Sequence, residues 1–422
     1  MSKYVIKGLK PLLGRVKISG NKNSILPCLA ASLLTDQEVI LRNVPHIRDV
    51  AVFIQIFKTL GVEVEFGDHF LKIQAKKINK PNLEKELVSK LRASILLAGS
   101  LLSRCGKVEF DHPGGDIIGK RSIDTHLNGF LELGYKISKS DLSYEASGKI
   151  NADDGKIIFL DESSVTAIEN LLLASALSPN LIVFKNCPEE PHVVDLCRML
   201  VAMGVEIRGI GTSTLYVRGT KECKGVDFTI SPDHIEFGTY AIASAITDGE
   251  VEISGCQFED LYPIISPLKK MGVGFEKIDN QTIKVYKKDL IAIPSLKVNI
   301  WPGFPTDMMS IAIVLATQAK GVCICHDWMY ETRMFFVDKL ITMGAEIIIA
   351  DPHRVIISGP SKLIGRELDT PDIRAGMALV LAGLAAGDES IIHKAELIER
   401  GYEDVVEKLT SLGARIEKIE ES

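Results

Sequence analysis

The chain of 422 residues has few aromatic side chains, and it has neither a metal-binding cysteine pattern nor a long apolar run. Phe, Trp and Tyr make up 6% of the residues. The longest apolar stretches, such as 377–386, fall well short of the roughly 20 residues that a membrane-spanning helix needs. A hydrophobic share of 46% excludes a disordered chain. We therefore expect a globular protein with more than one core and no membrane span.

The cysteines and the first residues favour a cytoplasmic protein. None of the eight cysteines lies in a CxxC pair, and the closest two, Cys323 and Cys325, fall in an apolar run typical of a strand. The segment MSKYVIKGLKPLLG lacks the continuous apolar stretch and cleavage site of a secretory signal. Thiols stay reduced in the cytosol, so we expect structural cysteines. The formal net charge of -6 argues against a nucleic-acid partner.

A pattern that ends a helix and begins a strand recurs six times along the chain. An amphipathic helix is followed by glycine and then by alternating apolar and polar residues. The six glycines, 68 to 73 positions apart, are Gly61, Gly134, Gly204, Gly272, Gly344 and Gly413. Each is expected to adopt the left-handed conformation that ends a helix. Six units of about 70 residues fill the chain.

Each unit also contains a helix that is apolar nearly all round. The six segments are NSILPCLAASLL, ASILLAGSLLS, AIENLLLASAL, FGTYAIASAI, DMMSIAIVLAT and RAGMALVLAGLAA. A helix without a polar face must be buried. The unit is thus strand, buried helix, strand, loop, surface helix and strand. One core does not accommodate six units, so we predict an α/β protein of two domains with three repeats each and a boundary near 230–232.

Polar and charged residues gather where these buried helices begin. They are Lys22, Asn23, Arg92, Ser164, Asp233, Glu236, Asp307, Asp372 and Arg374. For Ser164 and Asp233, helix capping and a functional role stay equally open. Capping does not explain Lys22, Arg92 and Arg374, because a cation at a helix N-terminus opposes the macrodipole. Such cations are typical of an anion site, which predicts a phosphate-bearing substrate.

A second set of charged residues lies in loops. It consists of Asp116, Lys120, Arg121, Asp124, Glu331, Arg333 and Arg400. The PGGD segment at 113–116 has the composition of a flexible turn. Because a carboxylate stands beside Lys and Arg in this glycine-rich segment, the alternative is a loop that closes over a ligand.

At these residues the chain resembles the UDP-N-acetylglucosamine 1-carboxyvinyltransferases, which open bacterial peptidoglycan synthesis. The resemblance covers essentially the full length, through SGNKNSILPCLAASLL, LRASILLAG, PGGDIIGKRSIDTHL, FPTDMM, ETRMF and DIRAGMALVLAGLAA. The sister family, the 5-enolpyruvylshikimate-3-phosphate synthases, would have a KSxSxR-like stretch in place of NKNSIL. The resemblance implies an inside-out α/β barrel of two domains, 1–21 plus 232–422 and 22–231, the latter with the PGGD catalytic loop. Helix N-termini would converge on the cleft between them.

The activity implied by the resemblance is transfer of the enolpyruvyl group of phosphoenolpyruvate to the 3'-hydroxyl of UDP-N-acetylglucosamine. The reaction passes through a tetrahedral ketal that expels phosphate, and neither a metal nor an organic cofactor takes part. Both small molecules are the implied partners, with no nucleic acid or membrane, and the oligomeric state stays open. A non-catalytic regulatory homologue that binds UDP-sugar is the alternative. The retained catalytic set favours the enzyme.

The resemblance also implies the site residues. Lys22 and Asn23 would meet phosphoenolpyruvate, Arg121 and Arg400 its phosphate, and Arg333 and Arg374 its carboxylate. Asp372 would also bind substrate, and the residues that would line the UDP-sugar site together with Arg121 are Arg92, Ser122, Ile123, Asp124, Thr125, Asp161, Glu162, Ser163, Ser164, Asp307 and Met329. Asp307 looks like the base for the hydroxyl, and Asp116 occupies the loop position of the acid.

Position 116 is the main departure from the family, which usually has Cys there. A carboxyl with a reference pKa of about 3.9 is ionised at neutral pH, whereas a thiol at about 8.5 is protonated. We hypothesise that bound anions and exclusion of water raise the Asp116 pKa. Fosfomycin inhibits the family by alkylating this Cys, so we expect resistance. Milder departures are Ser122 for Pro, Thr166 for Gly in the uridine loop and Thr332 for Asn.

Overall fold

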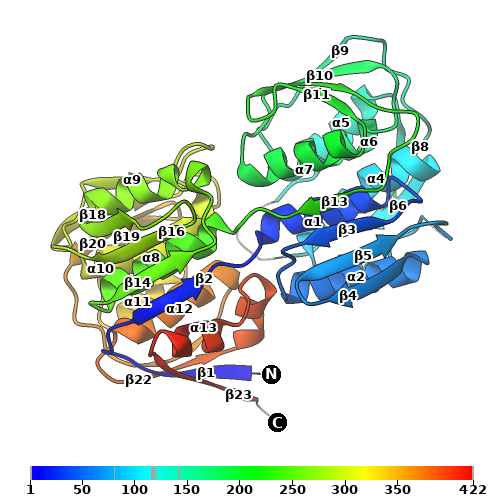
Figure 1. The fold of residues 1–422 in the computed structure, drawn as a ribbon. Helices are drawn as coiled ribbons and strands as arrows, with labels where there is room; N and C mark the ends of the chain where they lie inside the picture. Colours follow the sequence, from blue (N-terminus) through cyan, green and yellow to red (C-terminus); the bar gives the residue numbers. More distant parts are fainter. Residues whose placement is uncertain (1, 80, 116–118, 120, 141–142, 421–422) are drawn as a thin grey trace. The chain divides into compact units, whose positions relative to one another are not determined.

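The computed structural model describes residues 2–79, 81–115, 119, 121–140 and 143–420 (Figure 1). These residues form two compact units. Unit 1 comprises 2–19, 119 and 232–420, and unit 2 comprises the described residues of 20–115 and 121–231. Apart from the short segment that contains residue 119, the backbone lies in unit 2 between Ser19 and Pro232 and in unit 1 elsewhere. Each unit has its own apolar core.

Six sheets contain the strands of the described residues. Those of unit 2 are β13(Asp227–Thr229)-β3(Val39–Arg42)-β5(Phe70–Gln74)-β4(Glu63–Gly67), β6(Lys107–Asp111)-β8(Ser143–Ser147)-β7(Lys136–Lys139) and β11(Glu206–Arg208)-β12(Thr214–Arg218)-β10(Leu181–Lys185)-β9(Lys156–Phe159). Those of unit 1 are β15(Val273–Lys277)-β16(Thr282–Lys287)-β14(Glu250–Ser254)-β2(Leu13–Lys17), β17(Ser295–Lys297)-β18(Gly321–His326)-β20(Arg354–Gly359)-β19(Glu346–Asp351) and β21(Glu367–Asp369)-β22(Glu389–His393)-β1(Ser2–Lys7)-β23(Arg415–Glu420).

The sheets repeat one pairing pattern. Five of them have one parallel edge pair, and their other strands run antiparallel. In the sixth sheet the parallel pair is reduced to an isolated bridge between Asn82 and Glu109. One sheet for each sequence unit is the structural counterpart of the repeat of about 70 residues.

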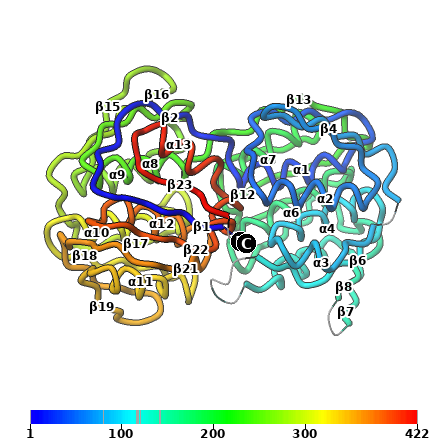
Figure 2. Tube along the Cα trace, turned by 90° about the horizontal axis from the view of Figure 1, so that it is seen from below, coloured from blue at the N-terminus to red at the C-terminus, as the bar shows by residue number. Residues whose placement is uncertain are grey.

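In two repeats, the first strand pairs in one unit and the helix that follows it lies in the other unit. β2 pairs with β14 in unit 1, although the helix that follows it belongs to unit 2. β13 pairs with β3 in unit 2, although the helix that follows it belongs to unit 1. β1 pairs with both β22 and β23, so the strands from the two ends of the chain lie side by side (Figure 2).

The apolar helices lie inside the units, as predicted. They are α1(Lys22–Ser32), α4(Leu96–Cys105) and α6(Val165–Ser175) in unit 2, and α8(His234–Ile246), α10(Met309–Gln318) and α12(Ile373–Ala385) in unit 1. Within each unit the three helices contact one another, and every residue of α12 is buried. The 3-10 turns η1(Arg92–Ile95) and η3(Thr306–Met308) precede α4 and α10. This arrangement confirms the inside-out α/β fold.

The second helix of each repeat ends as predicted. These helices are α2(Arg48–Leu60), α5(Asp124–Glu132), α7(Pro191–Ala202), α9(Tyr262–Lys270), α11(Val337–Thr342) and α13(Val405–Ser411). The glycines that follow them have φ between +80° and +104°, the left-handed conformation. The prediction of a surface helix is wrong for α7, most of which is buried because it packs against α1.

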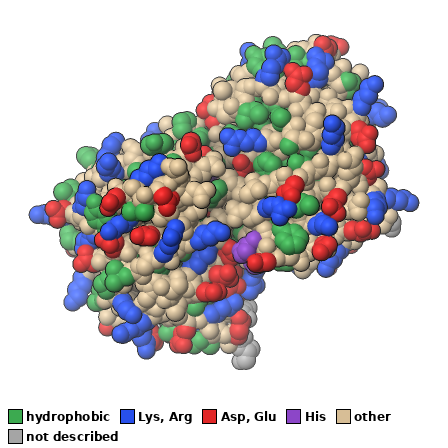
Figure 3. Space-filling model, in the orientation of Figure 1, with side chains coloured by type: hydrophobic (Ala, Val, Ile, Leu, Met, Phe, Trp, Pro, Cys, Tyr) green, Lys and Arg blue, Asp and Glu red, His purple; other side chains and the backbone are tan. Residues whose placement is uncertain are grey.

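The surface and the cysteines agree with the composition. Basic and acidic side chains are interspersed over the face in Figure 3. Within the described ranges, no helix has the length and hydropathy required to cross a bilayer. All eight cysteines are free thiols, and seven of them are buried. Cys323 and Cys325 lie in β18, as the apolar run predicted.

Candidate active site

Lys22 is the first residue of α1, where its positive charge opposes the helix macrodipole. The side chain of Asn21 caps the helix by accepting from the backbone N–H groups of Asn23 and Ser24. Lys22 Nζ lies 3.1 Å from Asp49 Oδ2 in the first turn of α2. The Asp49 side chain is only 2% exposed, so this ion pair fixes the lysine. The sequence analysis missed Asp49, although the HIRD segment that contains it was a visible signal.

Arg92 connects the start of η1 with the segment before α5. Its guanidinium is buried and donates from Nη2 to the carbonyl of Ser122 at 2.7 Å. Ser122 Oγ donates to Asp124 Oδ2 at 2.6 Å and accepts from the Asp124 N–H at 3.0 Å. Ile123 is buried, and Arg121 is half-buried. The structure therefore brings together Arg92 and the 121–124 segment, which the resemblance assigns to one site.

A pocket of about 440 Å³ lies between α5 and the end of β9. Thr125, Asn128, Phe159 and Asp161 are among its lining residues. Two of these, Thr125 and Asp161, were predicted to bind the UDP-sugar. The pocket is large enough for part of such a ligand.

The start of α6 lacks a side-chain cap. Ser164 occupies the N-cap position, but its hydroxyl makes no cap hydrogen bond. Ser163 is half-buried like Ser164, and Asp161 and Glu162 are exposed. The capping alternative is therefore wrong for Ser164, and its hydroxyl stays available to a ligand. For Asp233 the capping alternative is confirmed, because its carboxylate accepts from the N–H groups of Ile235 and Glu236.

A buried neutral network joins α4, α5 and α6. His126 Nε2 lies 3.1 Å from Thr166 Oγ1, and its Nδ1 lies 3.0 Å from Asn170 Nδ2. Asn170 also accepts from the Gly99 N–H at 2.6 Å and donates to the Ile95 carbonyl at 2.9 Å. Burial, with the nearby Arg92 charge, lowers the pKa of His126 to about 3. The imidazole is neutral at physiological pH. The sequence analysis did not single out His126 or Asn170.

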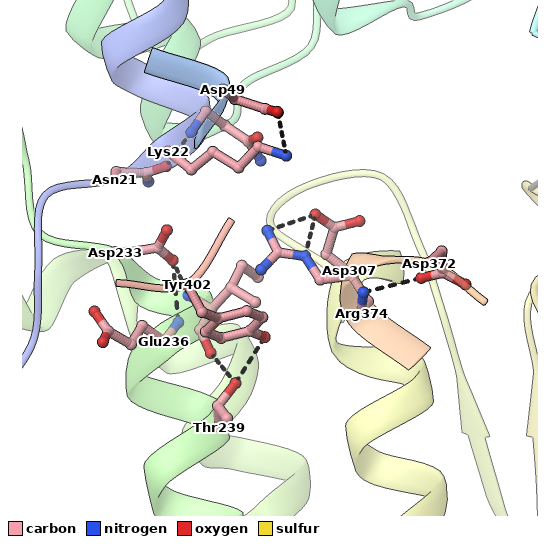
Figure 4. A network of polar contacts seen from close by, with 12 residues as sticks. Asn21, Lys22, Asp49, Asp233, Glu236, Thr239, Asp307, Asp372, Arg374 and Tyr402 are labelled. Carbon is pink, nitrogen blue, oxygen red and sulfur yellow. Dashed lines mark hydrogen bonds and ion pairs between the residues drawn. The ribbon is translucent and has the colours of Figure 1, made fainter. Parts of the chain in front are cut away.

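In unit 1, Asp307 contacts Arg333 and Arg374, and its contact with Arg374 is drawn in Figure 4. Arg333 Nη2 is 3.1 Å from Asp307 Oδ1, and Arg374 reaches Oδ2 with Nε at 3.1 Å and Nη2 at 3.0 Å. The arginine side chains are 3% and 5% exposed, whereas that of Asp307 is 28% exposed. Asp307, the predicted base, thus contacts the two arginines that were predicted to bind the carboxylate of phosphoenolpyruvate. Its own side chain is the most exposed of the three.

Each of the two guanidinium groups has a nitrogen whose N–H is not used by the contacts with Asp307. Arg333 Nε and Arg374 Nη1 are buried and have no hydrogen-bond partner among the residues that the structure describes. Burial acts to lower the pKa of each arginine, but Asp307 and the other nearby acidic groups and tyrosines together outweigh it, so both pKa values are raised. Buried charged donors without partners are costly unless an anion uses them. This geometry is suited to a carboxylate or phosphate ligand.

Two neighbours orient Arg374. Asp372 caps α12, and its Oδ1 accepts from the N–H groups of Arg374 and Ala375, both at 2.9 Å. The guanidinium lies over the ring of Tyr402, 5.2 Å from its centroid. The Tyr402 hydroxyl lies 3.0 Å from Thr239 Oγ1 in α8. Asp372, which was predicted to bind substrate, thus has a structural role at the helix start.

A buried carboxylate that the sequence analysis missed orders the loop after β18. Asp327 accepts from the Thr306 hydroxyl in η3 and from the Met329 N–H. Its side chain is fully buried. Asp327 therefore ties the predicted substrate residue Met329 to the turn that presents Asp307. It is the Asp of the segment HDWMYETR at 326–333, which has no periodic pattern that would have singled it out.

The predicted residues are divided between the units. Lys22, Asn23, Arg92, Arg121 to Thr125 and Asp161 to Ser164 belong to unit 2. Asp307, Met329, Arg333, Asp372, Arg374 and Arg400 belong to unit 1, where Arg400 ends η4(Ala395–Arg400). Asp116 lies outside the described residues. The gathering of Lys22, Arg121, Arg374 and Arg400 in one crevice stays a prediction.

Known proteins similar to this chain share both its sequence and its fold. The EPSP synthase (3-phosphoshikimate 1-carboxyvinyltransferase) family matches residues 6–409. A UDP-N-acetylglucosamine 1-carboxyvinyltransferase of Treponema denticola is 43% identical over 99% of both chains. One of Bradyrhizobium diazoefficiens is 44% identical over 99% of this chain and 98% of its own.

Solved structures support the fold. The enolpyruvyl transferase NikO from Streptomyces tendae has a TM-score of 0.87 at 24% identity and covers 99% of this chain and 98% of its own. An EPSP synthase from Acinetobacter baumannii has a TM-score of 0.75 at 18% identity over the full length of both. The arginine cluster, the six-sheet fold and the full-length identity agree, and the chain belongs to the UDP-N-acetylglucosamine 1-carboxyvinyltransferase family of enolpyruvyl transferases.

Proposed function

We propose that this protein transfers the enolpyruvyl group of phosphoenolpyruvate to the 3'-hydroxyl of UDP-N-acetylglucosamine and releases phosphate. Relatives more than 40% identical over the full length are named for this activity. The observation in the structure that supports it best is the pair of buried arginines at Asp307 with donors in reserve. The reaction would serve peptidoglycan synthesis.

Arg333 and Arg374 are proposed to bind the carboxylate of phosphoenolpyruvate. Guanidinium groups match a carboxylate with two parallel hydrogen bonds, which a lysine cannot do. The unused donors, Arg333 Nε and Arg374 Nη1, would supply part of this contact. Arg121 and Arg400 are assigned to the phosphate, and Lys22, which is held by its ion pair with Asp49, is assigned to phosphoenolpyruvate together with Asn23.

Asp307 is proposed as the base. The 3'-oxygen forms a bond to C2 of phosphoenolpyruvate, its proton passes to Asp307, and the Asp116 carboxyl gives a proton to C3. The ketal then loses phosphate from C2, the Asp116 carboxylate takes a proton back from C3 to restore the double bond, and the proton on Asp307 passes to the departing phosphate. The ion pairs with Arg333 and Arg374 hold the Asp307 carboxylate in place for this role.

The proposed acid, Asp116, predicts insensitivity to fosfomycin. A carboxylate attacks an epoxide far more slowly than a thiolate does. Turnover should persist after incubation with the drug, while Asp116→Cys should be inactivated over time. Mass spectrometry provides the check, since a drug adduct on Asp116 of the unaltered protein would contradict the expectation.

A coupled phosphate-release assay tests the function. We expect release only when phosphoenolpyruvate and UDP-N-acetylglucosamine are both present. UDP-sugar binding without phosphate release would instead support the regulatory homologue. Release with shikimate 3-phosphate in place of the UDP-sugar would indicate the sister activity.

A further inference from the structure

A lysine of α13 lies between two buried carboxylates of unit 1. Lys408 Nζ is 2.6 Å from Glu236 Oε1 in the first turn of α8 and 3.9 Å from Glu403 Oε2 in the loop between η4 and α13. The side chains of Lys408, Glu236 and Glu403 are 15%, 5% and 3% exposed. Burial raises the pKa of Glu236, and the charge of Lys408 opposes this rise. Because a buried carboxylate is costly without an opposite charge, Lys408 holds the cluster together.

The fourth member of the cluster is Ser19, which follows β2 in the sequence. Its hydroxyl donates to Glu403 Oε2 and accepts from Lys408 Nζ at 2.5 Å. Its backbone N–H donates to Glu236 Oε2 at 2.6 Å, and its carbonyl accepts from the Asp233 N–H at 2.9 Å. The cluster therefore joins three segments of unit 1 that are far apart in sequence, namely the residue after β2, the start of α8 and the loop before α13.

The loop that contains Glu403 also carries residues of the candidate active site. Arg400, which is assigned to the phosphate of phosphoenolpyruvate, precedes Glu403 by three residues. Tyr402 is the neighbour of Glu403, and its ring centroid lies 5.2 Å from the Arg374 guanidinium. The Tyr402 hydroxyl lies 3.0 Å from Thr239 Oγ1 (Figure 4). A displacement of Glu403 would therefore move Arg400 and the ring that supports Arg374.

We propose that Lys408 is a positioning residue for phosphoenolpyruvate, and that it acts through Glu403 on the loop that presents Arg400. A buried ion pair contributes little net stability, since desolvation offsets its attraction, but its directional contacts fix the partners in one position. This inference rests on the proposed function. It gives a role to a lysine and a glutamate that act through other side chains and not on the reacting atoms.

Steady-state kinetics of phosphate release by Lys408→Met tests the inference on the full chain. Methionine keeps most of the length of the side chain and removes its charge. We expect the KM for phosphoenolpyruvate to rise roughly tenfold, because a displaced Arg400 loses a charge-assisted hydrogen bond to the phosphate. The KM for UDP-N-acetylglucosamine should stay unchanged. Lys408→Arg, which keeps the charge, should recover most of the loss, and Lys284→Met, at an ion-paired lysine of β16, is the matched control.

A second variant, Ser19→Ala, decides the question if thermal unfolding shows that Lys408→Met does not fold. It keeps all three charged side chains and removes only the hydroxyl that contacts both Lys408 and Glu403. The KM for phosphoenolpyruvate should rise roughly fivefold, a smaller effect that corresponds to the loss of hydrogen bonds without loss of charge.

The outcomes separate this inference from the proposed function. If the unaltered protein releases no phosphate from phosphoenolpyruvate, both fail. If it turns over and neither variant changes the KM for phosphoenolpyruvate, the inference alone is overturned. An equal rise of both KM values, or a lower unfolding temperature with both KM values unchanged, would also overturn it, because a purely structural role would give these results.

Discussion

The Asp307 cluster and the His126 network are both polar groups at the starts of buried helices, but they differ in charge. The cluster in unit 1 is charged, with two buried arginines, a partly exposed carboxylate and donors in reserve. The network in unit 2 is neutral, and its histidine and amide groups are matched one to one. The first has buried donors that an anion could use, whereas the hydrogen bonds of the second hold its members in place.

The difference shows that charged and neutral polar groups have different roles in a buried site. A buried charge is costly unless an opposite charge is near, so a site that waits for an anion benefits from an internal carboxylate. A neutral network whose hydrogen bonds are complete gives rigidity without attracting ions. Substitutions in the cluster should therefore change turnover most, and those in the network should change stability most.

The largest effect is expected for Asp307→Asn, which keeps the size of the side chain and removes its charge. If Asp307 is the base, kcat should fall about a thousandfold, because positioned general bases contribute factors of this order. Thermal unfolding should show a folded protein. Asp338→Asn, an exposed carboxylate on α11, is the control for loss of charge. Retained turnover would remove the assignment of Asp307 as base.

The next effect is expected in the network. Asn170→Leu leaves the Gly99 N–H and the Ile95 carbonyl buried without their partner. The free energy of unfolding should fall by about 3 kcal/mol, since each buried polar group left unmatched costs 1–3 kcal/mol. Urea unfolding measures this, with Gln55→Leu, an exposed amide on α2, as the control. A change no larger than that of the control would show that the network does not stabilise unit 2.

A smaller effect should appear in the pH dependence. The folded pKa of His126 is lowered from 6.5 to about 3, so between these pH values the unfolded chain binds a proton that the folded chain does not. Its stabilising contribution is present above pH 6.5 and is lost as the pH falls toward 3, by up to about 1.4 kcal/mol per pH unit. The stability of the unaltered protein should fall more steeply than that of His126→Gln. Parallel curves would contradict the assignment of a neutral buried imidazole.

The smallest effect concerns the helix cap beside the cluster. Asp372→Ala should cost about 1 kcal/mol of stability through loss of the cap on α12. Asp372→Asn keeps an oxygen acceptor and should recover most of it. If either variant loses turnover far beyond its loss of stability, Asp372 also binds substrate, as the resemblance implies.

Much of the fold could be predicted because it repeats along the sequence. The glycine after each second helix marks a left-handed residue, and the apolar helices of each repeat mark the two interiors. The surface assignment failed for α7 because α7 packs against α1, which is more than 150 residues earlier in the sequence, and local pattern does not reveal such contacts. Local pattern also left Ser164 and Asp233 undecided, since both residue types favour helix starts.

The candidate site could be predicted only in part. Motifs named Asp307, Arg333 and Arg374, but they did not show that one carboxylate contacts both arginines. Asp49, Asp327 and Asn170 were missed because their roles depend on partners in other elements.

The sequence by itself determined the six repeats, the α/β class, the buried helices and the family, because each follows from spacing and residue type along the chain. The tertiary structure alone decided that Asp307 meets arginines 26 and 67 positions away, that Asp233 caps a helix while Ser164 does not, and that His126 Nε2 lies 3.1 Å from Thr166 Oγ1. The physical reason is that hydrogen bonds and ion pairs depend on distances of about 3 Å between side chains from different elements, and those distances exist only once the cores have packed.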